Sequence, residues 1–260
     1  MNLNVQHLGS GPDVVLLHGW GLHSGVFTRL AEHLASRFRI SLIDMPGHGR
    51  SPPPRQPFDL LQLTEVVAAA APYRATWLGW SLGGMVAAQL ALTASDRVEK
   101  LILVNSSPRF VAAADWPYAM DPAVLTGFAQ ALEDDYHATL ERFLSLQIAV
   151  GSVEARDNLR QLREMLQQYP TPSTQALRDG LAILRSADLR SKFSALNCPT
   201  LLILGDRDRL VPPTVAPAVK ALAPEISIEL IKGAGHVPFL SHQRLFLDAV
   251  SAFLEDDNGQ

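Results

Sequence analysis

The segment Gly79-Trp80-Ser81-Leu82-Gly83 constrains the fold of this chain more than any other segment does. It follows a strand-like run at residues 75–79 and precedes a helical pattern at residues 82–94. In a G-x-S-x-G sequence of this kind the serine occupies a tight, strained turn, and the two glycines leave room for it. The sequence therefore predicts a strand, a sharp turn and a helix, with the hydroxyl of Ser81 pointing out of the turn.

Similar strand-like runs recur along most of the chain. Short apolar runs lie at residues 13–17, 39–43, 75–79, 99–105, 199–204 and 226–231, with helical patterns at residues 24–37, 60–71 and 82–94 between several of them. Runs of this kind are typical of buried parallel strands. We therefore predict an α/β fold with a mostly parallel central sheet and helices on both faces.

The alternation stops between about Pro108 and Ala187, where apolar residues recur at helical spacing and no clear strand is visible. We interpret this stretch as a helical cap inserted into the fold. The predicted core then has two parts, residues 1–109 and 188–260, and the cap spans residues 110–187. The alternative is one extra helical layer of the core.

The composition fits one domain and argues against several classes of protein. The 260 residues are 47% hydrophobic and 18% charged, which is enough to bury a large core and too apolar for disorder. A formal charge of -4 argues against a general nucleic-acid binder. No uncharged apolar run reaches the roughly 18 residues of a membrane span, and the N-terminus does not read as a signal peptide. We expect a cytoplasmic monomer.

A serine hydroxyl becomes a strong nucleophile when a histidine takes its proton and a carboxylate orients that histidine. Asp208 follows the strand-like run at residues 199–204, and His236 lies in a glycine-rich loop after a later run. Loops at the carboxyl ends of parallel strands meet at one edge of the sheet. We therefore expect Ser81, Asp208 and His236 to be nucleophile, acid and base, in the chain order of G-x-S-x-G hydrolases.

Two of these assignments have rivals. Asp206 also follows the strand-like run, but it abuts Gly205 and is expected to shape the turn. His236 is distinguished by its late glycine-rich loop, and the alternative is an ordinary surface-loop histidine. The other histidines are His7, His18, His23, His33, His48, His137 and His242.

An oxyanion hole needs two backbone N–H groups aimed at the developing negative charge. Leu82, just after the nucleophile, and Trp20, in the loop after the first strong strand, are the candidates. The indole of Trp20 either lines an acyl pocket or belongs to the core. His18, Asp44 and His48 are expected to be structural groups of demanding loops. No residues have metal-ligand spacing, Cys198 is the only cysteine, and the chemistry needs no cofactor.

The segments LLHGWG, DMPGHGRS, GWSLGG, GDRDRLVP and GAGHVPF span nearly the whole chain and resemble the α/β-hydrolase superfamily. A narrower resemblance rests on LLHGWGL, WLGWSLGGMVA, the SSP at 106–108, ERFLSLQ and the LVP after Asp208. These segments are similar to the BioH family, the pimeloyl-[acyl-carrier protein] methyl ester esterases of biotin synthesis. The resemblance implies hydrolysis of a pimeloyl methyl ester carried on acyl carrier protein, with release of methanol.

The resemblance also implies roles for individual residues. It matches Ser81, Asp208 and His236 with the catalytic triad, and Trp20 and Leu82 with the oxyanion hole. Phe143 matches the substrate-lining cap segment, although it could equally be a helix core residue. The implied substrate-binding residues are Trp20, Leu82, Phe143, Leu144, Ser145, Leu146, Gln147 and His236.

Carrier proteins are acidic, so a mildly acidic esterase needs a local basic patch to bind one. The resemblance matches Arg142, Arg156 and Arg160 with carrier-binding arginines, while Ala138 stands where another arginine is expected. Arg156, Arg160 and Arg163 share one face if residues 154–167 are helical. The alternative is a solvated helix face paired with nearby acidic residues.

Two other functions fit the same residues. One is a general short-chain carboxylesterase or lactonase that acts on a free small-molecule ester. The other, from a different class, is a non-catalytic ligand receptor on the same fold. A serine at the turn argues against dehalogenases and epoxide hydrolases, which resemble each other in using aspartate there.

Overall fold

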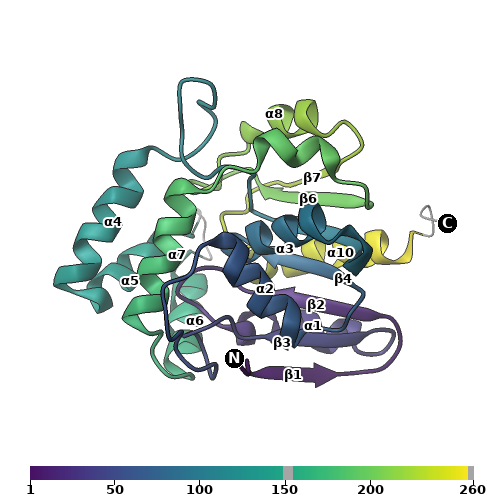
Figure 1. Cartoon of the computed structure of the whole chain (residues 1–260), viewed down its shortest axis with the longest axis horizontal. Helices are drawn as coiled ribbons and strands as arrows, with labels where there is room; N and C mark the ends of the chain where they lie inside the picture. Colours follow the sequence, from purple (N-terminus) through teal and green to yellow (C-terminus); the bar gives the residue numbers. More distant parts are fainter. Residues whose placement is uncertain (149–154, 257–260) are drawn as a thin grey trace.

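A seven-stranded sheet lies at the centre of the computed structural model, with helices on both of its faces (Figure 1). The structure describes residues 1–148 and 155–256. The strand order is β1-β3-β2-β4-β5-β6-β7, in which β1 pairs antiparallel with β3 and the other neighbours are parallel. The strands are Val5–Leu8 (β1), Asp13–Leu17 (β2), Arg39–Ile43 (β3), Ala75–Trp80 (β4), Val98–Val104 (β5), Thr200–Gly205 (β6) and Ser227–Ile231 (β7). The predicted α/β class is confirmed.

The sheet separates two hydrophobic cores because successive side chains of a strand point to opposite faces. In β2, Val15 and Leu17 pack into one core, and Val14 and Leu16 pack into the other. The first core is covered by α2 (Leu60–Ala70), α3 (Leu82–Thr93) and α8 (Val215–Leu222), and the second by α1 (Thr28–Leu34) and α10 (Gln243–Glu255). Central strands that are apolar on both faces are therefore explained by burial on both sides.

The predicted helix at residues 24–37 is divided in the structure. Residues Ser24–Phe27 form a 3-10 helix, and α1 follows directly and ends at Leu34. The side chain of His23 caps the first of these by accepting a hydrogen bond from the N–H of Gly25. The remaining short elements are the 3-10 helices Ser95–Arg97 and Arg190–Ala195 and the helix α9 (Pro238–Ser241).

Among its described residues, the segment between β5 and β6 contains four α-helices, which lie together at one side of the sheet (Figure 1). A backbone hydrogen bond of 2.9 Å from Leu189 N to Pro108 O joins the two ends of this segment. The helices are α4 (Pro122–Asp134), α5 (Tyr136–Leu146), α6 (Ala155–Gln167) and α7 (Thr174–Ser186). This arrangement supports a cap, whose bounds at residues 110–187 stay a prediction. Among the described residues, no helix is both long and apolar enough to cross a membrane.

The helices α6 and α7 are anchored on loops of the core. His23 donates a hydrogen bond of 2.8 Å from Nε2 to the carbonyl of Met165, and its ring stacks on Tyr169 with 3.7 Å between centroids. The indole of Trp20 donates a hydrogen bond of 2.8 Å to the carbonyl of Leu177. Both anchors come from the loop after β2, so the position of the helical segment depends on that loop.

Replacing His23 should loosen α6 without unfolding the sheet. His23→Ala removes the hydrogen bond to Met165 and the stack on Tyr169, each worth about 1 kcal/mol. We expect backbone amides of residues 155–167 to exchange hydrogen for deuterium at least about tenfold faster, as measured by mass spectrometry. His33→Ala, at an exposed position of α1, is the matched control. Equal exchange in the two variants would contradict the anchor.

Candidate active site

The turn between β4 and α3 has the strained geometry that the G-x-S-x-G sequence predicts. Ser81 has φ +55° and ψ −118°, a left-handed conformation that is rare for residues other than glycine. A Cβ atom at Gly79 would lie 2.2 Å from the carbonyl oxygen of Gly83, and one at Gly83 would lie 2.5 Å from the carbonyl oxygens of Leu17 and His18. Both glycines are therefore required by close backbone approach.

Two later loops bring Asp208 and His236 together. Asp208 Oδ2 lies 2.7 Å from His236 Nδ1, and both side chains are fully buried. The other carboxylate oxygen of Asp208 accepts hydrogen bonds from the N–H groups of Leu210 and Val211, at 2.7 and 3.0 Å. These bonds orient the carboxylate toward the imidazole.

The pairing with Asp208 determines the tautomer of His236. An ionised carboxylate can only accept, so Nδ1 of His236 carries the hydrogen and Nε2 carries the lone pair. Nε2 is buried and has no hydrogen-bond partner among the described residues. The imidazole is thus arranged to take a proton at Nε2, as a general base must.

Asp206 has a different partner. Its Oδ1 accepts a hydrogen bond of 2.6 Å from the N–H of Gly233, at the start of the loop that carries His236. This contact is the turn-shaping role expected of Asp206, and it leaves Asp208 as the carboxylate that contacts His236.

Trp20 and Leu82 carry the two backbone N–H groups that were expected to form an oxyanion hole beside Ser81. Within the described residues, neither Trp20 N nor Leu82 N donates a backbone hydrogen bond. Leu82 is the first residue of α3, and a Cβ atom at Gly19 would lie 3.2 Å from Cβ of Ser81. The loop that carries Trp20 therefore passes directly beside the serine.

His18 orients the peptide group that contains the N–H of Trp20. Nε2 of His18 accepts a hydrogen bond of 2.9 Å from Met45 N, so Nδ1 carries the hydrogen and donates to Gly19 O at 2.8 Å. The carbonyl of Gly19 and the N–H of Trp20 belong to one trans peptide and point in opposite directions. By holding the carbonyl, His18 fixes the direction of the N–H.

His48 contacts the same loop through Gly21. Its Nε2 accepts a hydrogen bond of 3.3 Å from Gly21 N, and its Nδ1 donates to the carbonyl of Pro46 at 3.0 Å. Burial is the largest cause that lowers the pKa of His48 to about 4 and the pKa of His18 to about 3. Both rings are therefore neutral near pH 7 and act as structural hydrogen-bonding groups.

Asp44 ties the loop after β3 to its surroundings. Its carboxylate accepts hydrogen bonds from Ser24 N, from Arg50 N and from the side-chain amide of Asn4, at 2.8, 3.0 and 2.9 Å. Burial opposes ionisation, but the nearby His18 and these donors leave the pKa of Asp44 below its ordinary value. The carboxylate is fully used within the fold, as expected for a structural group.

Phe143 and Gln147 of the expected substrate segment approach the same place. The ring of Phe143 packs edge-on against Trp20, with 4.7 Å between centroids. The backbone carbonyl of Gln147 accepts a hydrogen bond of 2.9 Å from His236 N. Both polar atoms of the Gln147 side chain are buried and have no hydrogen-bond partner among the described residues.

The residues between them point in several directions. Leu144 is buried in the core that contains α1 and α10, and Leu146 is half-buried. Ser145 is exposed, and its hydroxyl donates to the carbonyl of Glu141 on its own helix. The structure therefore does not bring Ser145 to the other site residues, and its role in substrate binding stays a prediction.

The three expected carrier-binding arginines are exposed on α5 and α6. Arg142 lies over the ring of Phe128, 5.4 Å from its centroid. Arg160 pairs with Asp157 at 3.0 Å and with Glu164 at 4.0 Å, so part of its charge is compensated. Ala138 is exposed on α5. Residue 154, the first of the predicted helix, lies outside the described residues, and α6 begins at Ala155.

Two residues of this region were not identified as site residues from the sequence. The indole of Trp80 donates a hydrogen bond of 2.8 Å to His236 O, and its ring centroid lies 5.5 Å from that of His236. Asn105 contacts the loops of both Asp208 and His236. Trp80 lies inside the G-x-S-x-G segment, whereas no pattern marked Asn105.

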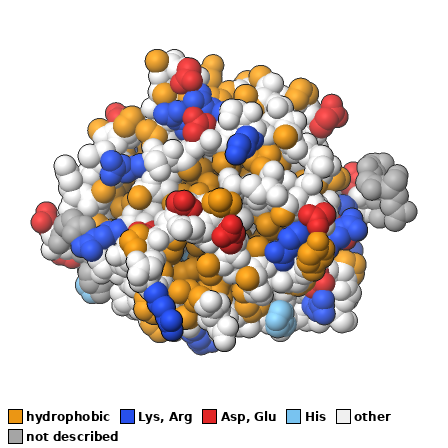
Figure 2. All heavy atoms as spheres, viewed as in Figure 1, with side chains coloured by type: hydrophobic (Ala, Val, Ile, Leu, Met, Phe, Trp, Pro, Cys, Tyr) orange, Lys and Arg blue, Asp and Glu red, His pale blue; other side chains and the backbone are white. Residues whose placement is uncertain are grey.

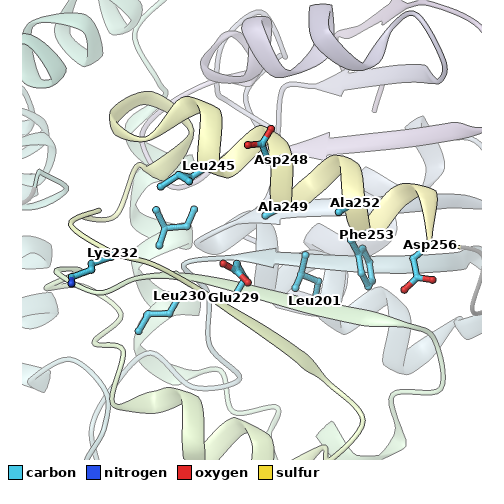
Figure 3. Close-up of a pocket in the computed structure, with 11 residues that line it drawn as sticks. Leu201, Glu229, Leu230, Lys232, Leu245, Asp248, Ala249, Ala252, Phe253 and Asp256 are labelled. Carbon is cyan, nitrogen blue, oxygen red and sulfur yellow. The ribbon is translucent and has the colours of Figure 1, made fainter.

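A cavity of about 560 Å³ lies away from these residues, between α10 and the last strands of the sheet (Figure 3). Leu201, Leu230 and Leu245 contribute to its apolar wall, and Glu229, Asp248 and Asp256 contribute acidic groups. Ser81, Asp208 and His236 do not line this cavity.

In the described part of the chain, no three histidine, cysteine or acidic side chains are grouped as metal ligands would be.

Comparison with known proteins agrees with this geometry. Residues 12–243 match the family model described as the alpha/beta hydrolase fold. The chain is 43% identical to the pimeloyl-[acyl-carrier protein] methyl ester esterase of Aeromonas hydrophila over 255 residues, 98% of this chain and 100% of that protein. It is 46% identical to the esterase of the same name from Serratia marcescens over 253 residues, 96% of each chain.

The likeness extends to solved structures. An esterase from Exiguobacterium antarcticum superposes with a TM-score of 0.88 at 24% identity, over 98% of this chain and 96% of that one. At this identity the likeness shows the fold alone.

Because His48 is buried and neutral, the free energy of unfolding should depend on pH in the acidic range. The pKa of His48 is about 4 in the folded protein and about 6.5 ordinarily. Below pH 6.5 the unfolded chain binds a proton that the folded protein does not bind, so folding stability falls as the pH falls toward 4. Over that range His48 should account for a loss of about 3 kcal/mol.

Urea denaturation at unit steps from pH 8 to pH 4 checks this expectation. Between pH 6 and pH 5, His48→Gln should reduce the slope of unfolding free energy against pH by about 1.4 kcal/mol per pH unit, since one linked proton is removed. Above pH 7 the two proteins should show the same slope. An unchanged slope at acidic pH would contradict a buried neutral His48.

Proposed function

The chain belongs to the alpha/beta hydrolase fold family and, within it, to the pimeloyl-[acyl-carrier protein] methyl ester esterases, and we propose that it hydrolyses the substrate for which those relatives are named. The products are pimeloyl-[acyl-carrier protein] and methanol, and the reaction is a step of biotin synthesis. The observation that carries this proposal is 43–46% identity over nearly the full length of named relatives. The pairing of Asp208 with His236 on loops near Ser81 supports it.

Acylation uses the tautomer that Asp208 imposes on His236. Nε2 of His236 takes the proton of Ser81 as the hydroxyl oxygen attacks the carbonyl carbon of the methyl ester. Asp208 stabilises the resulting imidazolium through Nδ1. The oxyanion accepts hydrogen bonds from Trp20 N and Leu82 N, which are worth most in a site that excludes water.

Collapse of the tetrahedral intermediate completes the first half of the reaction. The bond to the methoxy oxygen breaks, and His236 donates its proton so that methanol leaves. A water molecule, deprotonated at His236, then attacks the acyl-serine and releases the free carboxylate of the pimeloyl chain. The proton returns to Ser81, so no cofactor is consumed.

The substrate enters between the cap, residues 110–187, and the core. Phe143 against Trp20 supplies an apolar wall for the methylene chain. The side-chain amide of Gln147 is buried without a partner, which supports its use as a hydrogen-bonding group toward the ester. Leu144, Ser145 and Leu146, which lie between these two residues in the sequence, are kept as proposed members of the cap side of this site.

The carrier docks on the cap through Arg142, Arg156 and Arg160. Lysine and arginine side chains are interspersed with acidic ones over the face seen in Figure 2, so an acidic partner must find a local group of arginines. No carboxylate pairs with Arg142 or Arg156 among the described residues, which leaves their charges available. A carrier held there presents the far, methylated end of the pimeloyl chain to Ser81 and keeps the thioester away from Ser81.

The enzyme acts as a monomer in the cytoplasm.

Ser81→Ala tests the nucleophile. Loss of one triad member lowers kcat by at least about a thousandfold, because no alkoxide equivalent can form. The measurement is hydrolysis of p-nitrophenyl acetate and of pimeloyl-carrier methyl ester, with circular dichroism to check folding. If a folded variant kept most of its activity with both esters, the mechanism would be wrong.

Carrier recognition is tested by comparing kcat/KM for pimeloyl-carrier methyl ester with kcat/KM for the same ester free of carrier. We expect a preference for the carrier-bound ester that weakens between 20 and 300 mM salt, since exposed charges are screened beyond about 10 Å at 0.1 M salt. Arg142→Glu and Arg156→Glu should each lower that preference about tenfold or more. Arg74→Glu, an exposed arginine far from the cap, is the matched control.

The free ester should be hydrolysed equally well by the wild type and the arginine variants. Equal kcat/KM for both substrates at every salt concentration would contradict carrier recognition and would indicate a general carboxylesterase.

A further inference from the structure

Asn105 has a backbone conformation that its residue type rarely adopts. Ser81, with φ +55°, and Asn105, with φ +42°, are the two non-glycine residues of left-handed φ within residues 1–148 and 155–256. Strain of this kind persists only where the surrounding structure holds it, and it is concentrated at functional sites. Asn105 directly follows β5 and is completely buried.

The side chain of Asn105 bridges the two loops that carry the acid and the base. Its Oδ1 accepts a hydrogen bond of 2.8 Å from Gly205 N, three residues before Asp208. Its Nδ2 donates a hydrogen bond of 3.0 Å to Gly235 O, in the residue just before His236. The orientation of the amide is determined, because an N–H can only donate and a carbonyl oxygen can only accept.

The two loops touch each other where Asn105 holds them. A Cβ atom at Gly205 would lie 2.3 Å from the carbonyl oxygen of Gly235, so the backbones are in direct contact there. The next residue, Ser106, donates a hydrogen bond of 2.8 Å to the carbonyl of Ser81. The end of β5 thus contacts the strand ends or loops of all three expected catalytic residues.

We propose that Asn105 is a positioning residue that sets the distance between Asp208 and His236 by holding Gly205 and Gly235 together. It touches neither substrate nor reacting atoms. This inference rests on the proposed function, since it takes Asp208 and His236 as the working acid and base. Loss of the bridge lets the imidazole move relative to the carboxylate and to Ser81, and a misplacement of about 1 Å can lower the rate about 100-fold.

Two variants separate the bridge from the backbone strain. Asn105→Gly removes both side-chain hydrogen bonds and adopts a left-handed φ without strain. Asn105→Asp also tolerates that conformation and keeps an acceptor for Gly205 N, but it has no donor for Gly235 O. Val250→Ala, a buried position on α10, is a control that lowers stability at a distance from the site.

The experiment measures kcat and KM for p-nitrophenyl acetate, the inactivation rate by a fluorophosphonate, and Tm. We expect both Asn105 variants to lose about 100-fold in kcat and in inactivation rate, with KM within about twofold of the wild type. The downfield proton resonance of Nδ1–H in His236 should weaken in both. Val250→Ala should lower Tm and keep kcat, KM and the resonance.

Kcat within twofold of the wild type in both Asn105 variants, with Ser81→Ala inactive, would overturn this inference alone. The inference would also be overturned if Val250→Ala lowered kcat as much as the Asn105 variants do at an equal loss of Tm. Retained activity in Ser81→Ala would overturn the proposed function and this inference with it.

Discussion

The strained turn at Ser81 is the constraint on which the rest of the site depends. A left-handed serine between β4 and α3 is less stable than an ordinary helix start, so neighbouring segments must hold it. Its N–H donates to Val104 O at 2.9 Å, and its carbonyl accepts from the hydroxyl of Ser106 at 2.8 Å. Both contacts come from the end of β5, the strand paired beside β4. The parallel sheet therefore both supports the turn at Ser81 and determines its position.

Buried imidazoles in this molecule differ by what their nitrogens contact. In His18 and His48 each ring nitrogen bonds to a backbone group, so burial leaves them neutral and inert. In His236 one nitrogen faces a carboxylate and the other has no partner among the described residues. A free basic nitrogen beside an ion-stabilising group is what proton transfer requires. Histidine thus occurs here both as a structural group and as a candidate base, and the hydrogen-bond partners of the two ring nitrogens distinguish the two cases.

Burial explains which strands could be predicted from the sequence. The runs that form β2 to β6 are apolar because most of their residues are buried between helices on the two faces of the sheet. The run that forms β7 is also recognisable in the sequence, although Ile231 alone of its five residues is buried. The strand β1, Val5–Leu8, was not predicted, because this half-exposed edge strand includes Gln6 and His7 and is only four residues long. The α/β class and the candidate nucleophile, acid and base followed from local segments, since each segment carries its own turn chemistry, whereas the esterase function rested on the resemblance of those segments to a family.

Roles that depend on distant contacts could not be predicted in this way. Asp206 and Asp208 were distinguished in the sequence by their place after the strand-like run, but their partners, Gly233 and His236, are visible only in the fold. Asn105 lies about 100 residues from Gly205 and 130 from Gly235, and a buried asparagine after a strand has no signature of its own. The exposure of Ser145 likewise depends on how α5 packs, which its sequence does not specify.

A backbone hydrogen bond joins the helical segment between β5 and β6 to the loop of His236. His236 N donates to Gln147 O, while His236 O accepts from the indole of Trp80 in the core. The backbone of His236 is therefore held by this helical segment on one side and by Trp80, the residue before Ser81, on the other. If the helical segment moved away, the N–H of His236 would need water as its new acceptor, and the imidazole would lose one of its constraints. Under the proposed function, substrate selection by the helical segment and proton transfer at His236 are thus linked through the position of His236.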